Sequence, residues 1–274
     1  GNMLGRALTA DVNTNLLHII GSNYQTGLKV SNSDVIADVG EIKVTGAGGR
    51  TALVIGNGST VEYDNRITLD GTGDVRVEIE NGANFTAKQI VSEAAGAKIQ
   101  ANQNGAVATV KDIIVEENSG LSFQTWSNNP SDSVTYNVEN IVLKEGATLK
   151  TVVEPGWSSA QIKGDNIDLT LGEGAIADFG AMEHVAWSTA KINVDANAMN
   201  ITFTGEDASS AKVYVSTNSD LIKEQKEITV TATGASNTGN VSADLGKLAN
   251  MVKLTTDIEN HVGDAPAIVN VDGV

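Results

Sequence analysis

A short module of alternating apolar residues followed by a glycine turn recurs along this chain, and it restricts the possible folds more than any other feature. Copies read "VRVEIENGANF" from Val75, "ENIVLKEGATL" from Glu139 and "NIDLTLGEGAIADF" from Asn166. Alternation with a period of two is typical of β-strands, and glycine supplies the positive φ that a sharp turn requires. No helical periodicity separates these copies, so the sequence predicts an all-β fold.

The turn glycines of this module are spaced by roughly two dozen residues, with one much shorter interval. They are Gly58, Gly82, Gly96, Gly120, Gly146 and Gly174, and the short interval separates Gly82 from Gly96. An antiparallel β-sandwich remains an alternative, but it has no reason to repeat one module in one order. A parallel solenoid does, because each coil stacks on its neighbour. We therefore predict a β-solenoid of about nine or ten coils, a rod about 45 Å long. The short interval implies two turns within one coil.

The pattern divides the chain into an N-terminal cap at 1–30, a parallel β-helix at 31–217, and last strands with a C-terminal cap at 218–274. The stretch "SADLGKLANMVKLTTDI" places Leu245, Leu248 and Met251 at helical spacing, with Ser242 or Asp244 as the N-cap. It predicts a short helix over the end of the solenoid, where an open coil would leave an unpaired strand edge.

Composition excludes several partners. The formal net charge of −16 repels phosphate backbones and anionic membranes, so we expect no nucleic-acid partner. The chain has no cysteine, which rules out disulfides, thiolate metal sites and a cysteine nucleophile. No apolar run is long enough to cross a bilayer, so we expect no direct membrane insertion of this segment.

Catalytic and metal-binding motifs are missing. The sequence lacks G-x-S-x-G, HExxH and the calcium nonapeptide, and the Gly-rich "DGTGDVRVEIE" from Asp70 does not match a calcium loop. The three histidines, His18, His184 and His261, are far apart. We therefore predict no catalytic residue, no metal and no cofactor, and we expect that the protein is not an enzyme.

Pairs of carboxylates are the remaining basis for an enzymatic alternative. A β-helical carbohydrate-active enzyme would need two carboxylates at a fixed separation. Candidate pairs are Glu116 with Glu117, Asp165 with Asp168, and Glu173 with Asp178. Among 34 acidic residues such adjacency is expected by chance, so a solvated face is the better interpretation.

Three tryptophans recur at nearly equal intervals, each followed by serine and then by a strand pattern. Trp126, Trp157 and Trp187 would lie near one another if they occupy equivalent corners of consecutive coils. Such a column could stack sugars or pack a partner, since an indole combines a large apolar face with one hydrogen-bond donor. They are the candidate ligand-binding residues, although a structural use is the preferred interpretation.

The Asn-, Thr-, Gly- and Asp-rich repeats, together with the lack of cysteine and the acidic, lysine-poor composition, resemble bacterial autotransporter passenger domains. The resemblance covers about Ala52 to Gly234. It implies a right-handed parallel β-helix, displayed at the cell surface as a fragment of an exported protein. It also implies an adhesin or self-association rod, whose partner is a host or bacterial surface glycan, a protein or a second copy. A passive stalk is a further alternative.

Overall fold

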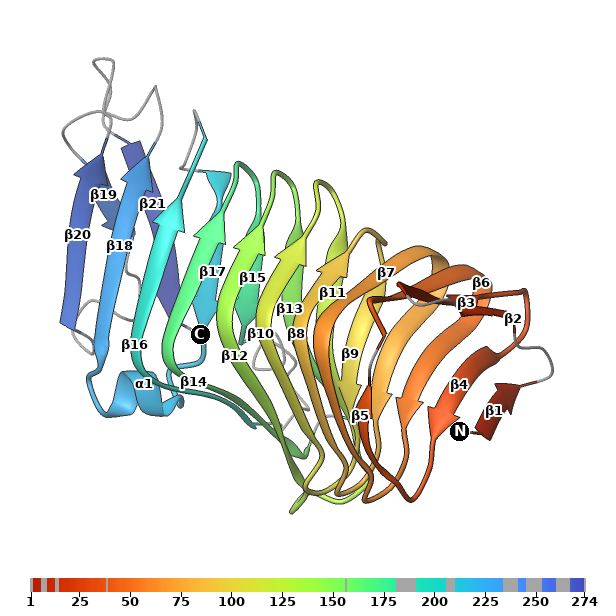
Figure 1. The fold of residues 1–274 in the computed structure, drawn as a ribbon. Coiled ribbons are helices and arrows are strands. Elements are labelled where there is room, and N and C mark those ends of the chain that lie inside the picture. The colour runs from red at the N-terminus through yellow and green to blue at the C-terminus, as the bar shows by residue number, and fades with distance from the viewer. Residues whose placement is uncertain are drawn as a thin grey trace.

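In the computed structural model, the backbone is described for residues 2–5, 9–12, 15–37, 39–155, 157–180, 191–205, 210–233, 241–244, 253–259 and 267–273. Side chains are described for 15–37, 39–155, 157–180, 191–205 and 210–232. These residues form strands stacked into an elongated rod and one short helix (Figure 1). In chain order the elements are β1 (Asn2–Gly5), β2 (Thr9–Val12), β3 (Leu16–Ile20), β4 (Thr26–Val30), β5 (Asp34–Ala37), β6 (Glu41–Ile55), β7 (Thr60–Ile79), β8 (Asn84–Ser92), β9 (Ala97–Ala101), β10 (Val107–Val115), β11 (Gly120–Trp126), β12 (Ser133–Leu143), β13 (Thr148–Glu154), β14 (Ser159–Leu171), β15 (Ile176–Phe179), β16 (Lys191–Phe203), β17 (Lys212–Val215), α1 (Asp220–Lys223), β18 (Glu227–Thr233), β19 (Val241–Asp244), β20 (Lys253–Glu259) and β21 (Ala267–Gly273).

Three parallel ladders, here called the first, second and third faces, run along the rod. The first face contains residues 34–37, 60–63, 84–87, 107–110, 133–138, 159–163 and 191–196. The second contains 16–20, 41–47, 66–72, 89–92, 112–115, 140–143, 166–171, 198–203, 227–233 and 253–259. The third contains 26–30, 50–55, 74–79, 97–101, 120–126, 148–154, 176–179, 212–215, 241–244 and 267–273.

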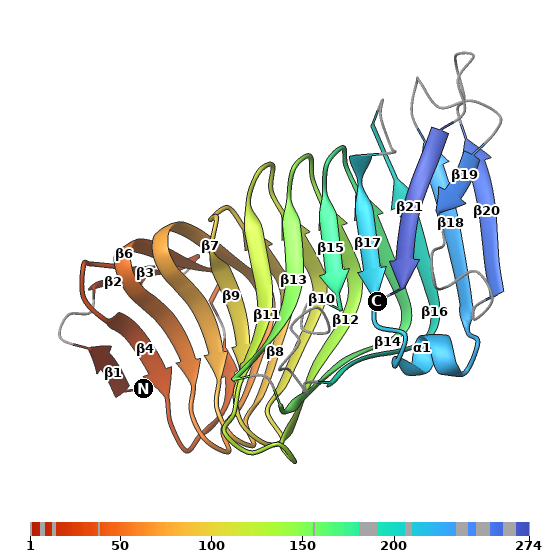
Figure 2. The ribbon, with the colours of Figure 1, turned by 180° about the vertical axis from the view of Figure 1, so that it is seen from behind.

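This arrangement confirms the predicted parallel β-solenoid, and the antiparallel sandwich is wrong. The rod has about 8 turns, against the nine or ten expected from the spacing of the module. The described first face has seven strands and the second and third faces have ten each, because the end coils lack a first-face strand. Figure 2 shows the third-face strands β11, β13, β15 and β17 side by side on the opposite side of the rod from the view of Figure 1.

Columns of similar side chains fill the inside of the coil. On the second face each member of one column is the register partner of the next, and none is more than 4% exposed. The column is Ile42, Ile67, Ile90, Ile113, Ile141, Leu169, Ile201 and Val230. Every second side chain of a strand points inward, so one apolar residue per coil at a fixed register forms a continuous core. Phe123 and Tyr136 add a stacked aromatic pair, with ring centroids 4.9 Å apart.

Left-handed residues occupy two separate corners of the coil. The corner from the third face to the first holds Gly58, Gly82 and Gly105, and the corner from the second to the third holds Asn118, Gly146 and Gly174. Gly82 and Gly96 lie at different corners of the same coil, which confirms two turns within one coil. Gly120 was wrongly predicted as a turn, because it begins β11. Asn118 takes the left-handed position there, with φ of 56°, since asparagine tolerates this conformation better than most residues.

The two ends of the ladders close differently. At the start, β2 pairs antiparallel with β3 and β1 with β4, so these strands cover the first edges of the second and third faces. The first face ends at β16, where α1 replaces a further strand. The hydroxyl oxygen of Ser219 accepts the Val194 N–H at 3.0 Å, and Asn193 Oδ1 accepts the Asp220 N–H at 2.7 Å.

The predicted C-terminal helix is wrong at both of its ends. Its N-cap candidates Ser242 and Asp244 belong to β19, and its last residues belong to β20, which pairs in parallel with β18. The β-branched Thr255, Thr256 and Ile258 suit a strand, and the edge of β18 supplies the pairing that a helix would leave unused. Residues 245–252 lie outside the described part. Within that part, no helix is long and apolar enough to traverse a lipid bilayer.

Candidate functional site

Three hollows on the outside of the rod join end to end along the bend between the first and second faces. They measure about 480, 440 and 320 Å³. Neighbouring hollows share lining residues: Lys111 belongs to the first and second, and Asn137 and Lys163 belong to the second and third. We call the whole the bend groove. It extends from Ile36, which is 81% exposed, to Asn197.

A row of polar and charged residues follows this groove. At the bend, only one or a few residues separate the first-face and second-face segments of each strand, and the members of the row are exposed there. In β8 and β10 the pairs Ala87 with Val110 and Gln89 with Asp112 are in register, so Lys88 lies opposite Lys111. Glu139 follows in β12 by the same register. We call the whole set the bend row: Asp64, Lys88, Lys111, Glu139, Asp165 and Asn197.

The central charges of the bend row have no partner of their own. All members of the row are exposed. Lys88, Lys111 and Glu139 form no ion pair with any residue in the described part of the chain. Lys163, which also lines the groove, differs: its Nζ lies 3.8 Å from Asp195 Oδ2. Charged side chains that are exposed and unpaired can pair with groups outside this chain.

Hydrogen-bonded amides hold the walls of the groove in place. Asn137 Nδ2 donates to Thr109 Oγ1 at 3.1 Å, and Asn140 Nδ2 donates to Asp112 Oδ1 at 2.9 Å. Such inter-coil ladders align equivalent residues of consecutive coils. Below the groove, the Tyr63 hydroxyl donates to the backbone oxygens of Arg66 and Gly40 at 2.8 and 3.0 Å. Burial raises the pKa of Tyr63 to about 12, so this phenol remains a donor at neutral pH.

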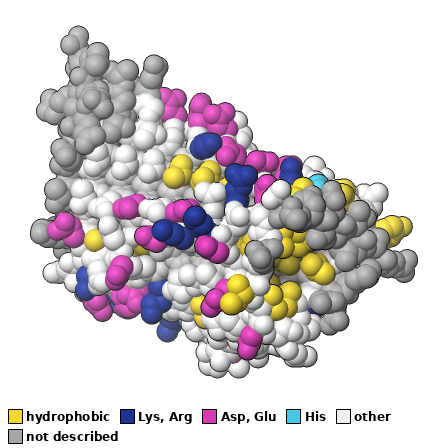
Figure 3. All heavy atoms as spheres, viewed as in Figure 1, with side chains coloured by type: hydrophobic (Ala, Val, Ile, Leu, Met, Phe, Trp, Pro, Cys, Tyr) yellow, Lys and Arg dark blue, Asp and Glu magenta, His cyan; other side chains and the backbone are white. Residues whose placement is uncertain are grey.

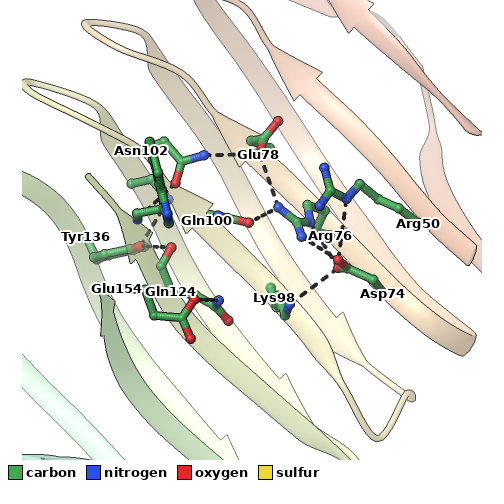
Figure 4. Close-up of polar contacts among 12 residues, drawn as sticks. Arg50, Asp74, Arg76, Glu78, Lys98, Gln100, Asn102, Gln124, Tyr136 and Glu154 are labelled. Carbon is green, nitrogen blue, oxygen red and sulfur yellow. Dashed lines mark hydrogen bonds and ion pairs between the residues drawn. The ribbon is translucent and has the colours of Figure 1, made fainter. Parts of the chain in front are cut away.

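A second polar cluster lies on the outer side of the third face (Figure 4). Its centre is Arg76, whose side chain is 5% exposed. The guanidinium donates to both carboxylate oxygens of Asp74, to Glu78 Oε1 at 3.1 Å and to Gln100 Oε1. Arg50 and Lys98 lie 3.5 and 3.6 Å from Asp74. The donors of Arg76 are therefore engaged within the chain, and this cluster stabilises the fold.

The third-face cluster makes stability depend on pH. Burial alone would raise the pKa of Asp74, but the hydrogen bond and charge of Arg76, with the charges of Lys98 and Arg50, lower it below its ordinary 3.8. A carboxyl group with a lowered pKa stabilises the fold above about pH 4, and this contribution is lost as pH falls through the lowered value.

We expect Asp74→Asn to show a shallower fall of the urea midpoint between about pH 4 and 2 than the wild type. Urea unfolding followed by circular dichroism at each pH measures this; Asp34→Asn, which changes an exposed carboxylate with no ion pair among the described residues, should follow the wild type. Equal slopes for Asp74→Asn and wild type would contradict the assignment.

The structure describes two of the three tryptophans that were predicted to bind a ligand. Trp126 ends β11 and is 41% exposed; Trp157 lies at the corner after β13 and is 38% exposed. Both occupy the corner from the third face to the first, in consecutive coils, on the other side of the first face from the bend groove. Trp187 lies outside the described residues. The column of three tryptophans therefore stays a prediction, and two of its members share a corner.

Four of the six carboxylates in the predicted pairs accept hydrogen bonds from other residues. Glu116 Oε2 accepts from Lys144 at 2.7 Å, and Asp165 and Asp168 accept from Asn197 and Asn200. Asp178 Oδ1 accepts the Gly180 N–H at 2.9 Å.

Within the described residues, the remaining metal-ligand candidates are engaged in other contacts or lie apart. Asp70 Oδ1 accepts the Gly71 N–H, and Asp74 is held by arginine and lysine, so the Gly-rich turn does not present free ligands. His18 Nε2 lies 2.8 Å from Thr45 Oγ1; His184 and His261 lie outside the described part. Among described residues no group of three or more His, Asp or Glu side chains could hold a metal ion.

Fold and site together define a class: a parallel β-solenoid with a groove along one bend and, beside it, exposed lysine and glutamate side chains that form no ion pair within the described part of the chain. In comparisons with known proteins, no family model, no curated protein and no solved structure matches this chain significantly. On the face of the rod drawn in Figure 3, acidic and basic side chains are interspersed, and hydrophobic side chains gather in patches between them.

Proposed function

We propose that this chain is a non-catalytic rod that associates with a second copy of itself through the bend row, as a surface-displayed passenger of a bacterial autotransporter. The observation that carries the proposal is the order of charges. Along the rod the row has an acid at Asp64, bases at Lys88 and Lys111, acids at Glu139 and Asp165, and the neutral Asn197.

This order is self-complementary when two rods lie antiparallel. A two-fold axis between the coils of Lys111 and Glu139 brings each Lys111 opposite Glu139 of the second copy. The same axis brings Lys88 opposite Asp165, and Asp64 opposite the neutral Asn197. Such an axis makes the contact isologous and closed, so two rods pair without growing further. The strand spacing of about 4.8 Å is the same in both copies, so the charges remain in step along the row.

The net charge sets the salt dependence of this contact. Each copy carries −16, and at very low salt this charge opposes association. At about 0.1 M salt the Debye length is about 10 Å, so distant repulsion is screened while charges in contact still attract. At about 1 M the contacts themselves are screened. Association should therefore be strongest at intermediate salt.

A charge-swap experiment tests the proposal. Lys88→Glu/Lys111→Glu makes the centre of the row entirely acidic, and Glu139→Lys/Asp165→Lys makes it entirely basic. Each double variant should self-associate at least about a hundredfold more weakly than the wild type, since facing like charges cost several kcal/mol. An equimolar mixture of the two variants should associate again, because the facing pairs among positions 88, 111, 139 and 165 are then all opposite in sign. Sedimentation equilibrium at about 0.1 M salt measures all three samples.

Lys150→Glu/Lys212→Glu is the matched control, because it changes the net charge equally at two exposed lysines of the third face. It should self-associate like the wild type. A wild type that remains monomeric at every salt concentration would contradict the proposal and leave a passive stalk as the simpler role. If both double variants associated as strongly as the wild type, the contact between the two copies would not involve the bend row.

A further inference from the structure

Two exposed tryptophans share one corner of the rod, and the proposed self-association does not use them. Trp126 is the register partner of Glu154, in the adjacent strand. Trp157 follows Glu154 by three residues, which span at most about 11 Å. Both indoles are therefore within reach of one extended ligand. Aromatic residues supply only 4% of this chain, yet two of its tryptophans are exposed at one corner and do not contribute their full surface to the core.

Hydrogen bonds hold the backbone of Trp126 in place, and this restricts where its exposed ring can lie. The Trp126 N–H donates to Asn102 Oδ1 at 3.1 Å, and the Trp126 carbonyl accepts the Gln103 N–H at 3.0 Å. The flanking Thr125 and Ser127 are 1% and 0% exposed. Strand alternation thus buries both neighbours and turns the indole outward.

A structural ladder of indoles is the other explanation, and the geometry does not favour it. Among described residues the stacked aromatic pair is Phe123 with Tyr136, inside the coil. Trp126 and Trp157 stay 41% and 38% exposed, whereas the inward residues of β11 and β13 are buried. About two fifths of each residue is therefore open to solvent.

Planar polar groups adjoin these rings. Gln124 Nε2, also on the outer side of β11, donates to Glu154 Oε2 at 3.2 Å (Figure 4). The loop after Trp126 is held by its own hydrogen bonds, with the Asn129 N–H donating to Ser127 Oγ at 3.1 Å. Amide and carboxylate groups of this kind can bind pairs of adjacent hydroxyls, accepting and donating together.

We propose that Trp126 and Trp157, with Gln124 and Glu154, form a binding site for a neutral oligosaccharide. The C–H groups on one side of a pyranose ring make an apolar face that stacks on an indole, while the ring hydroxyls at its edge meet the amide and the carboxylate. An acidic sugar is disfavoured, because Glu154 lies in the site and the whole chain carries −16. The site lies away from the bend row and does not depend on self-association.

Calorimetric titration with cellohexaose, chitohexaose and maltoheptaose tests the site, with an oligogalacturonide as the acidic comparison. At least one neutral sugar should bind, and the acidic one should not. Trp126→Ala should weaken binding about tenfold, and Trp126→Phe, which keeps a ring, should remain within about threefold of wild type. Trp157→Ala and Gln124→Ala should each weaken binding as well.

Tyr24→Ala is the matched control, since Tyr24 is 63% exposed at the corner from the second face to the third. It should bind sugar like the wild type. Circular dichroism confirms that each variant is folded, and sedimentation of Trp126→Ala should show unchanged self-association. Absence of heat with all three neutral sugars at about 10 mM, or wild-type affinity in folded Trp126→Ala, would overturn the site.

Discussion

Arg76→Ala is expected to lower the free energy of unfolding by about 3 kcal/mol, because it leaves Glu78 and Asp74 without their main cation in a largely buried setting. The Arg76 side chain is 5% exposed, and those of Glu78 and Asp74 are 15% and 27% exposed. Removing one member of such a network leaves partly buried charges that have lost water contacts and no longer have the partner that compensated for this loss. Urea unfolding followed by circular dichroism at pH 7 measures the loss.

The control is Arg66→Ala, which breaks a single ion pair at the surface. Arg66 lies 3.5 Å from Glu41, with side chains 49% and 32% exposed, so its loss should be below about 1 kcal/mol. A double variant, Arg76→Met/Glu78→Gln, should recover part of the loss, because it removes a buried charge together with its partner. Equal losses for Arg76→Ala and Arg66→Ala would show that burial does not set the strength of the third-face cluster.

Gly71→Ala is expected to destabilise the rod by about 4 kcal/mol or more, a size that indicates a specific steric cause. Gly71 has φ of 87°, and a Cβ there would lie 2.2 Å from the Gly46 carbonyl oxygen of the preceding coil. The coils approach so closely at this corner that neither backbone can move aside without breaking ladder pairing. Thermal and urea unfolding of the variant measure the loss.

Gly82→Ala separates the two causes of this effect. Gly82 has φ of 68°, but a Cβ there meets nothing within 4 Å. Its loss should therefore be only the cost of a left-handed alanine, about 1–2 kcal/mol. If Gly71→Ala cost no more than Gly82→Ala, the close approach of the coils at Gly71 would not be a constraint on this corner.

The fold was largely predictable because its information is local and repeated. Each module carries its own alternation and its own turn, so the parallel stack and the two turns near Gly82 and Gly96 follow from the pattern. Gly120 misled the prediction because glycine also starts strands, whereas Asn118 takes the turn. The C-terminal helix was predicted from the helical spacing of Leu245, Leu248 and Met251, which lie outside the described residues; the β-branched residues after them belong to β20 and pair with an existing strand edge.

The bend row was harder to find, although a signal for it exists. A charged residue, then a polar one, then isoleucine recurs as Lys88–Gln89–Ile90, Lys111–Asp112–Ile113 and Glu139–Asn140–Ile141. The sequence shows that these triplets repeat. It does not show that the charged residues are exposed at a bend, because that depends on where the inward alternation changes face. The corner shared by Trp126 and Trp157 was expected from their spacing, whereas their exposure was not.

By itself, the sequence determined the all-β class, the stacking of coils and the residues that form the core columns, since alternation and turn chemistry act within a few residues. Only the tertiary structure decided which charges become neighbours along the bend and which carboxylates Arg76 occupies. It also decided that both indoles stay open to solvent. These outcomes depend on the register between coils roughly two dozen residues apart, and a shift of one residue would send every outward side chain inside.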